Sequence, residues 1–275
     1  MEKLKTIQRY LKYYRKADTI YQVHSPFVYE FAEQVLEDDR DFYAFDIVEY
    51  LRNILKQNKD TISITDFGAG SKSSKSKNRT VGSIAKNAAS RPWQCQTLFR
   101  LVNFYKPKTM VEIGTSLGIS TLYQAMAALN AEFYTLEGDP IISKIAQHNF
   151  KELKMSQIQM VQGNFDKTIY PTLEKIKQLD YIFIDGNHRL EPTFRYFETA
   201  LKYAHSESVF VIDDIHWSDE MERAWLKIKN HPQVTISIDL FHMGIVFFRK
   251  ENREKEHFIL APLSWKPWGS GKLFK

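Results

Sequence analysis

The stretch that decides the fold runs from Thr109 to Thr121 and reads TMVEIGTSLGIST. Its first part, TMVEI, is mostly apolar and predicts a buried strand that carries one acid, Glu112. Gly114 and Gly118 follow, and the next residues predict the start of a helix. Glycines let the backbone approach a ligand closely, and a helix start offers free amide N–H groups. The stretch therefore predicts a ligand-binding turn, although its glycine spacing does not fit the G-x-G-x-x-G pattern of dinucleotide sites.

Strand-like apolar runs alternate with helical segments after this point in the chain. The runs read TMVEI, EFYTLE, IQMVQG, DYIFID, SVFVID, VTISIDL and GIVFFRK. Such alternation predicts a doubly wound α/β fold, with a mostly parallel seven-stranded sheet and helices on both faces. The last two runs are separated only by Phe241–Met243, which is too short for a crossover, so they predict an antiparallel hairpin at the sheet edge.

Composition divides the chain into four parts. Residues 1–60 carry apolar side chains at helical spacing and predict a helical N-terminal extension. Residues 61–91 predict a basic Gly/Ser/Lys loop or lid, in which Asp66–Gly70 (DFGAG) imitates the glycine turn but lacks a matching second acid. Residues 92–250 contain the α/β domain, and residues 251–275 predict a C-terminal surface tail.

The overall composition excludes several classes of protein. The 275 residues are 43% hydrophobic and 26% charged, which excludes a disordered or fibrous chain. The single cysteine, Cys95, excludes a disulfide framework and a multi-cysteine metal site. No apolar run approaches the roughly 18 residues of a membrane helix, and the first residues contain no signal-peptide core. We therefore expect a cytoplasmic protein without membrane contact.

Positive charge is concentrated in one segment. Between Phe67 and Val111 there are nine Lys and Arg residues and no acid, although the net charge of the whole chain is only +5. A solvated loop and helix face explains such a segment, and a collar that attracts an anionic substrate is the functional alternative. We therefore do not expect a nucleic-acid partner. A small-molecule acceptor that carries negative charge remains open.

Acids end the first two predicted strands of the α/β domain. Glu112 lies beside the glycine turn, and Glu137 ends the second strand 25 residues later. A carboxylate beside the turn repels a pyrophosphate and suits a cationic ligand, while one on the second strand can accept both hydroxyls of a ribose. We expect Glu112 and Glu137 to face one cleft and to bind a nucleoside joined to a cationic amino acid.

Four motifs strengthen this expectation, because VEIGTSLGIST, YTLEGDP, VQGNFDKT and YIFIDGNH resemble the successive motifs of class I S-adenosylmethionine-dependent methyltransferases. The resemblance covers about residues 92–249 and implies a Rossmann-like methyltransferase fold. It implies that Glu137 binds the ribose hydroxyls, that Asn164 and Phe165 flank the adenine, and that Asp185 lies near the cofactor. It also implies that the methionine end of the cofactor is bound by residues of the glycine turn and adjoining positions, namely Glu112, Gly114, Thr115, Ser116, Gly118 and Gly138.

A second group of acids follows the fourth and fifth strands of the domain. Asp185 ends YIFID, and Asp213 and Asp214 end VFVIDD. The carboxyl ends of neighbouring strands face one crevice, where acids repel one another unless a cation compensates. This pattern resembles the metal-dependent O-methyltransferases of the catechol type and of the natural-product sugar type. The resemblance implies that Asp185, Asp213 and Asp214 bind Mg²⁺ or another divalent cation; paired aspartates are also common as helix caps.

His188, three residues after Asp185, is the candidate base. The resemblance implies this role, because the catechol-type enzymes have a lysine base and the sugar-type enzymes a histidine at this position. A usual pKa near 6.5 suits removal of a proton from a metal-bound hydroxyl, and Asp185 is the second predicted catalytic residue. The sequence thus predicts methyl transfer to a hydroxyl of a small molecule or sugar, with His216 as a weaker second base. A methyltransferase acting on RNA or another anionic substrate, a metal-independent small-molecule methyltransferase, and a non-catalytic cofactor-binding protein remain alternatives. The oligomeric state, including a homodimer, is left open.

Overall fold

The computed structural model describes residues 2–64, 78–87, 89–251 and 254–267. The described α-helices are α1 (Glu2–Lys16), α2 (Pro26–Phe31), α3 (Tyr43–Gln57), α4 (Val81–Asn87), α5 (Pro92–Tyr105), α6 (Ile119–Ala127), α7 (Pro140–Glu152), α8 (Phe165–Ile176), α9 (Leu190–Leu201) and α10 (Asp219–Lys229). The strands are β1 (Thr61–Ser63), β2 (Asn78–Thr80), β3 (Thr109–Ile113), β4 (Glu132–Glu137), β5 (Ile158–Gln162), β6 (Leu179–Ile184), β7 (Ala204–Asp213), β8 (Ile236–Asp239), β9 (Met243–Phe247) and β10 (Glu256–Ile259). Short helical turns lie at Ile20–Gln22, Ala32–Leu36 and Leu263–Trp265.

The central sheet has the strand order β10-β8-β9-β7-β6-β3-β4-β5. Strands β3 to β7 are mutually parallel, while β9 runs antiparallel to β7 and β8. This confirms the predicted α/β sheet with its antiparallel hairpin. The chain winds outward from β3 in both directions, so the order reverses between β3 and β6. Ligands of open α/β sheets bind at such a reversal, outside the carboxyl ends of the strands.

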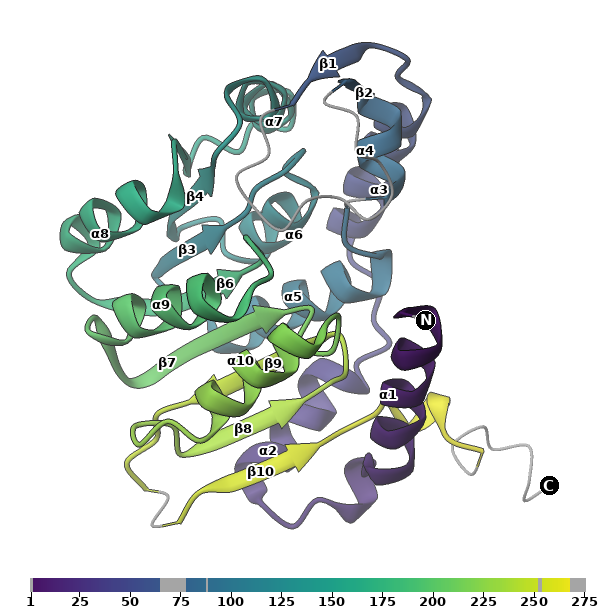
Figure 1. The fold of residues 1–275 in the computed structure, drawn as a ribbon, viewed down its shortest axis with the longest axis vertical. Helices are drawn as coiled ribbons and strands as arrows, with labels where there is room; N and C mark the ends of the chain where they lie inside the picture. The colour runs from purple at the N-terminus through teal and green to yellow at the C-terminus, as the bar shows by residue number, and fades with distance from the viewer. Residues whose placement is uncertain (1, 65–77, 88, 252–253, 268–275) are drawn as a thin grey trace.

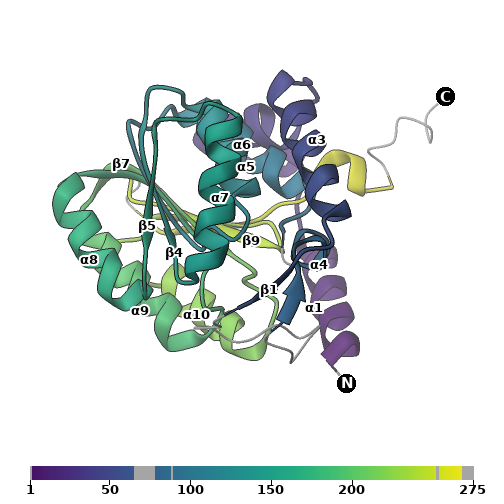
Figure 2. The same ribbon diagram turned by 90° about the horizontal axis from the view of Figure 1, so that it is seen from above.

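Helices cover both faces of this sheet because its strands are apolar on both sides (Figures 1 and 2). Helices α8, α9 and α10 lie on one face, where Leu173, Phe197 and Trp225 pack against β3, β6 and β7. Helices α5 and α6 lie on the other, and Leu98 belongs to the core beneath them. A parallel sheet buried on both faces reads as continuous apolar runs, which is why the strands could be identified from sequence.

Two segments differ from the prediction. Residues 61–91, expected as a loop or lid, include a two-stranded antiparallel sheet of β1 and β2 and the helix α4. Within residues 251–275, expected as a surface tail, β10 adds an eighth strand that runs parallel to β8. Because charged residues flank the four-residue EHFI run of β10, a hydrophobic-pattern analysis does not identify it as a strand. The predicted turn at Asp66–Gly70 lies outside the described residues.

The helical extension packs directly on the α/β domain. From α3, Val48 and Leu55 belong to one core with Cys95 and Phe99 of α5 and with α6. Helix α1 lies at the side of the molecule toward which the arrowheads of the parallel strands point (Figure 1). In the described part of the chain, no helix combines the length and apolarity needed to cross a bilayer.

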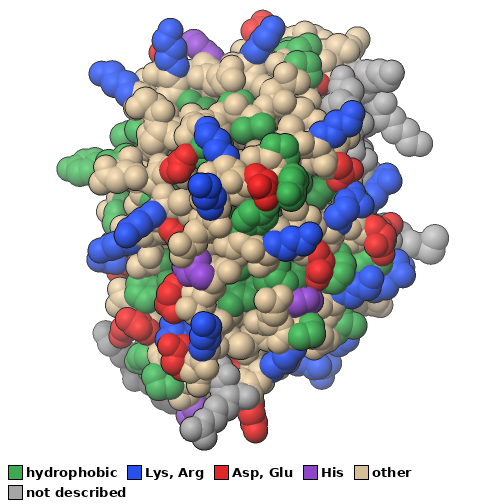
Figure 3. Space-filling model, turned by 90° about the vertical axis from the view of Figure 1, so that its left-hand side faces the viewer, with side chains coloured by type: hydrophobic (Ala, Val, Ile, Leu, Met, Phe, Trp, Pro, Cys, Tyr) green, Lys and Arg blue, Asp and Glu red, His purple; other side chains and the backbone are tan. Residues whose placement is uncertain are grey.

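Charges of both signs share the surface that faces left in Figure 1 (Figure 3). Lys and Arg side chains alternate there with Asp and Glu, and hydrophobic side chains are scattered between them. A protein that binds nucleic acid through its backbone phosphates presents a basic patch or stripe. The described side chains of this face do not form one.

Candidate active site

The turn after β3 approaches the end of β6 closely. Gly114 has φ +102°, and a Cβ atom on it would lie 2.5 Å from the carbonyl oxygen of Asp185. Gly118 has φ +81°, and a Cβ atom there would lie 2.4 Å from the ring of Phe150. Both positions therefore require glycine for the backbone conformation and for space. The predicted turn thus packs closely against Asp185, the residue that follows β6.

A narrow cavity lies between this turn, Asp185 and the segment before α5. Its lining residues are Ala89, Ser90, Gly114, Thr115, Ser116, Leu117, Ile119, Ser120 and Asp185. Three of the residues predicted to bind the cofactor at the turn, together with Asp185, are therefore brought to one cavity. Ser90, which the sequence did not single out, also lines this cavity.

Glu112 does not reach this cavity, contrary to our expectation. Its side chain is fully buried, and its Oε1 accepts hydrogen bonds from Ser120 Oγ (2.8 Å) and Gln124 Nε2 (2.9 Å). Its Oε2 accepts from Thr121 Oγ1 and from Thr135 Oγ1, the latter at 2.6 Å. Burial raises the pKa of Glu112 to about 7 despite these bonds. Glu112 therefore ties α6 to β3 and β4 below the cavity.

Glu137, at the end of β4, lies beside the turn. Its Oε2 accepts from the backbone N–H of Ser116 (2.9 Å), and its Oε1 accepts from that of Asp139 (2.9 Å). Burial raises the pKa of this carboxyl, while the backbone donors oppose the shift. The backbone N–H of Gly138 is a third donor to this carboxyl. A carboxylate has about four acceptor positions, so about one remains for a hydroxyl group of a ligand. Glu137 and Glu112 thus face different surroundings, one beside the turn and one in the core.

The predicted adenine-binding residues begin α8. Asn164 caps this helix, since its Oδ1 accepts from the N–H of Asp166 at 2.9 Å. The ring of Phe165 lies against Gly186, where a Cβ atom would be 2.7 Å from it. Gly138 is buried directly after β4. Phe165 therefore lies against the residue that follows Asp185 at the end of β6.

The second group of acids does come together, and His188 lies inside it. His188 Nε2 is 3.2 Å from Asp185 Oδ1, and its Nδ1 is 3.2 Å from Asp214 Oδ2. Asp213 and Asp185 are linked by a hydrogen bond between their carboxyl groups. His188 and Asp214 both have positive φ angles, +41° and +54°, which non-glycine residues seldom adopt. The two strand ends thus hold these side chains in a fixed arrangement.

Charge is only partly balanced in this acidic cluster, which we define as Asp185, His188, Asp213 and Asp214. Burial raises the pKa of Asp213 well above its usual range, and repulsion from Asp185 and Asp214 adds to the shift. Burial alone would lower the pKa of His188, but bonds and charges from Asp185 and Asp214 raise it well above its usual range. Three carboxyl groups thus share one imidazole, an arrangement that suits a cationic ligand in the adjoining cavity.

Metal binding by these acids is not what the observed arrangement favours. The imidazole lies between Asp185 and Asp214, where it compensates the carboxylates. Among the residues described, no group of three or more His, Cys, Asp or Glu side chains is arranged to hold an ion. Hard carboxylate oxygens do suit Mg²⁺ chemically, but here the side chains do not fit an ion without rearrangement.

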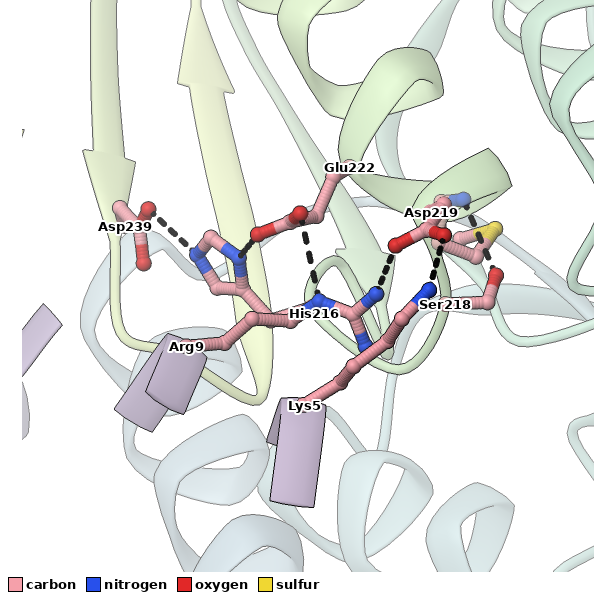
Figure 4. A network of polar contacts seen from close by, with 8 residues as sticks. Lys5, Arg9, His216, Ser218, Asp219, Glu222 and Asp239 are labelled. Atoms are coloured by element: carbon pink, nitrogen blue, oxygen red, sulfur yellow. Dashed lines mark hydrogen bonds and ion pairs between the residues drawn. The ribbon is translucent and has the colours of Figure 1, made fainter. Parts of the chain in front are cut away.

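A polar network from α1, β8 and α10 holds the loop that follows Asp214 (Figure 4). His216 Nδ1 lies 2.8 Å from Glu222 Oε1, and its Nε2 lies 2.9 Å from Asp239 Oδ2. Arg9 of α1 reaches Glu222 at 3.3 Å and also pairs with Asp219. Both ring nitrogens of His216 contact acids, so this residue links the loop to α10 and β8.

Comparison with known proteins bears on the fold and on the type of the α/β domain. Residues 111–215 match the family described as a methyltransferase domain. A catechol O-methyltransferase from Niastella koreensis is 31% identical over 127 residues, 45% of this chain and 57% of that protein. The O-methyltransferase hkm8 from Aspergillus hancockii is 27% identical over 146 residues, 51% of this chain and 57% of that protein. The matches thus span little more than half the length of these relatives.

Solved structures share the architecture over more of the chain. The O-methyltransferase of Bacillus cereus in complex with SAH has a TM-score of 0.53 at 18% identity, covering 80% of this chain and 97% of that one. The O-methyltransferase TomG of Streptomyces achromogenes, in complex with SAM, has a TM-score of 0.54 at 16% identity, covering 76% and 91%. Residues 111–215 are thus similar to a methyltransferase domain, and the chain has the fold of class I S-adenosylmethionine-dependent methyltransferases.

Proposed function

We propose that this protein is an S-adenosylmethionine-dependent O-methyltransferase that acts on a hydroxyl group of a small molecule. The observation that carries the proposal is the cavity in which the Gly114–Ser116 turn meets Asp185, with Glu137 beside the turn. Asp185 provides a carboxylate for a cationic ligand group, and Glu137 has an acceptor position left for a ribose hydroxyl. These residue types suit S-adenosylmethionine, which supplies an electrophilic methyl group when bound; the cavity, at about 10 Å³, has to widen to admit it.

The acidic cluster supplies the proton acceptor in this proposal. Asp214 and His188 are its more exposed members, with 31% and 23% of their side chains accessible. For this step the acceptor hydroxyl would bond to an unprotonated His188 Nδ1 in place of Asp214. His188 would take the hydroxyl proton as the methyl group is transferred to oxygen, and the neighbouring Asp214 carboxylate would stabilise the imidazolium that forms. Asp185 would hold the imidazole through Nε2 during the transfer. Positioning and compensation of the developing charge supply the catalysis.

Two measurements test the proposed activity. Isothermal calorimetry should detect S-adenosylhomocysteine binding, and substitution of Glu137 by Ala should weaken it, because the proposed ribose acceptor is lost. Radiolabelled methyl groups should then be transferred to members of a panel of phenols, catechols and sugars. Absence of binding to the wild-type chain would refute the proposal.

Metal assistance, with Asp185, Asp213 and Asp214 as ligands, is the finer proposal that the sequence pattern suggests. We derive no step from it, because His188 lies between two of these acids. If it is correct, EDTA should abolish turnover, Mg²⁺ should restore it, and Asp213→Ala should remove the EDTA-sensitive activity while leaving cofactor affinity near normal. Turnover that is unchanged by EDTA would favour the metal-independent form.

A further inference from the structure

A buried cation connects the helical extension to the proposed cofactor cavity. Arg52 of α3 is only 2% exposed. Its Nε is 2.9 Å from Glu49 Oε1, its Nη1 donates to the carbonyl oxygen of Ser90 at 2.7 Å, and its Nη2 donates to Cys95 Sγ at 3.5 Å. A buried guanidinium is tolerated only when it is paired and hydrogen-bonded. The three acceptors, which come from α3, the cavity wall and α5, meet that condition.

The acceptors of Arg52 lead to both walls of the cavity. Ser90 lines the cavity directly, and its carbonyl also accepts a contact from Cys95 Sγ at 3.6 Å. On the other side, Glu49 accepts a hydrogen bond from Tyr123 Oη of α6 at 2.9 Å. Helix α6 begins directly after the glycine turn. Arg52 thus contacts Ser90 in the cavity lining directly and, through Glu49, is linked to α6, the helix that follows the glycine turn.

We propose that Arg52 is a positioning residue for the cofactor, which sets the distance between the Ser90 wall and the glycine turn. The inference rests on the proposed function and assigns to the N-terminal extension a role in cofactor binding. Without the guanidinium, the Ser90 carbonyl loses its strongest donor and Glu49 its cationic partner. Small displacements of a binding wall can cost up to about 100-fold in a reaction that depends on fixed geometry.

The test compares two substitutions of Arg52 with a matched control in the same helix. Arg52→Met removes the charge and all three contacts. Arg52→Lys keeps a cation for Glu49 but cannot reproduce the planar fork that reaches the other acceptors. Val48→Ala is the control, because Val48 is fully buried on α3 but does not line the cavity. For each protein, calorimetry gives the Kd of S-adenosylhomocysteine, and thermal unfolding gives the melting temperature.

We expect both Arg52 variants to bind S-adenosylhomocysteine at least tenfold more weakly than wild type. Val48→Ala should lower the melting temperature but leave this Kd unchanged. In turnover assays, the KM for S-adenosylmethionine should rise in Arg52→Lys, while kcat at saturating cofactor is largely kept. If Arg52→Met does not fold, the Lys variant decides.

Two outcomes would count against different proposals. Wild-type affinity in Arg52→Lys, or an equal loss of affinity in Val48→Ala, would show that Arg52 serves stability alone and would overturn this inference. Failure of the wild-type protein itself to bind S-adenosylhomocysteine would instead overturn the proposed function. The two failures are therefore distinguishable in one set of titrations.

Discussion

Glu112 at the end of β3 and Asp213 at the end of β7 are both buried strand-end acids, yet their surroundings differ. Glu112 accepts hydrogen bonds from four neutral side chains and is closed off from the cavity. Asp213 lies among other titratable groups, next to Asp185 and the charges of Asp214 and His188. The first arrangement stabilises the fold, and the second leaves charge that can act on a ligand. Acids with the same place in the topology can thus serve structure or chemistry, depending on the donors around them.

The largest expected effect is on stability, from Glu112→Ala. Four donors would lose their acceptor, and a cavity would remain below the glycine turn. We expect a loss of about 3–5 kcal/mol in the free energy of unfolding, measured by urea titration. A loss below about 1 kcal/mol would mean that Glu112 is not the link between α6 and the sheet.

The pH dependence of stability sharpens the same point. An acid whose pKa is raised by folding, from 4.5 to about 7 for Glu112, binds its proton more tightly in the folded state. The stabilisation from this bound proton is therefore complete below pH 4.5 and is lost as the pH rises through 7. The shift of the pKa from 4.5 to about 7 corresponds to about 3 kcal/mol in the free energy of unfolding. In Glu112→Gln, whose side chain does not titrate, the free energy of unfolding should not show this loss between pH 4.5 and 7. Parallel pH profiles for the wild type and the variant would contradict the raised pKa.

Asp214→Asn tests whether the acidic cluster takes part in catalysis. Asparagine is nearly isosteric and tolerates the positive φ of this position, so the fold should be kept. Methyl transfer should fall about 100-fold, because His188 loses a carboxylate that stabilises its protonated form. The turnover number and the melting temperature should be measured together. Unchanged turnover would remove Asp214 from the proposed proton transfer.

The smallest effect is expected from Lys5→Ala in the network of Figure 4. Lys5 pairs with Asp219 at 2.9 Å, but both side chains are about half exposed or more. Exposed ion pairs contribute little, so the melting temperature should not change measurably. Arg9→Ala is the informative partner variant, because the side chain of Arg9 is only 8% exposed and contacts two acids. Arg9→Ala should lower the melting temperature, and equal effects of the two substitutions would contradict the importance of burial.

The sheet was predictable because its strands are local apolar runs separated by helical patterns. The convergence of Asp185 with Asp214 followed from the parallel topology and from the family resemblance. The role of Glu112 was not predictable, because its donors Ser120 and Gln124 lie on a helix whose orientation the sequence does not state. Arg52 gave no signal either, since a basic residue on an amphipathic helix is usually solvent-exposed.

The pairing of β10 with β8 bears on how the protein can be shortened. Residues Ile236–Asp239 of β8 are all buried, and on one side their backbone groups pair with Glu256–Ile259. A chain cut after Arg249 would leave that row of amide and carbonyl groups open next to apolar side chains. Open sheet edges of this kind pair with other chains. Expression of the α/β domain alone should therefore give a protein prone to self-association, and the last strand belongs in any minimal version.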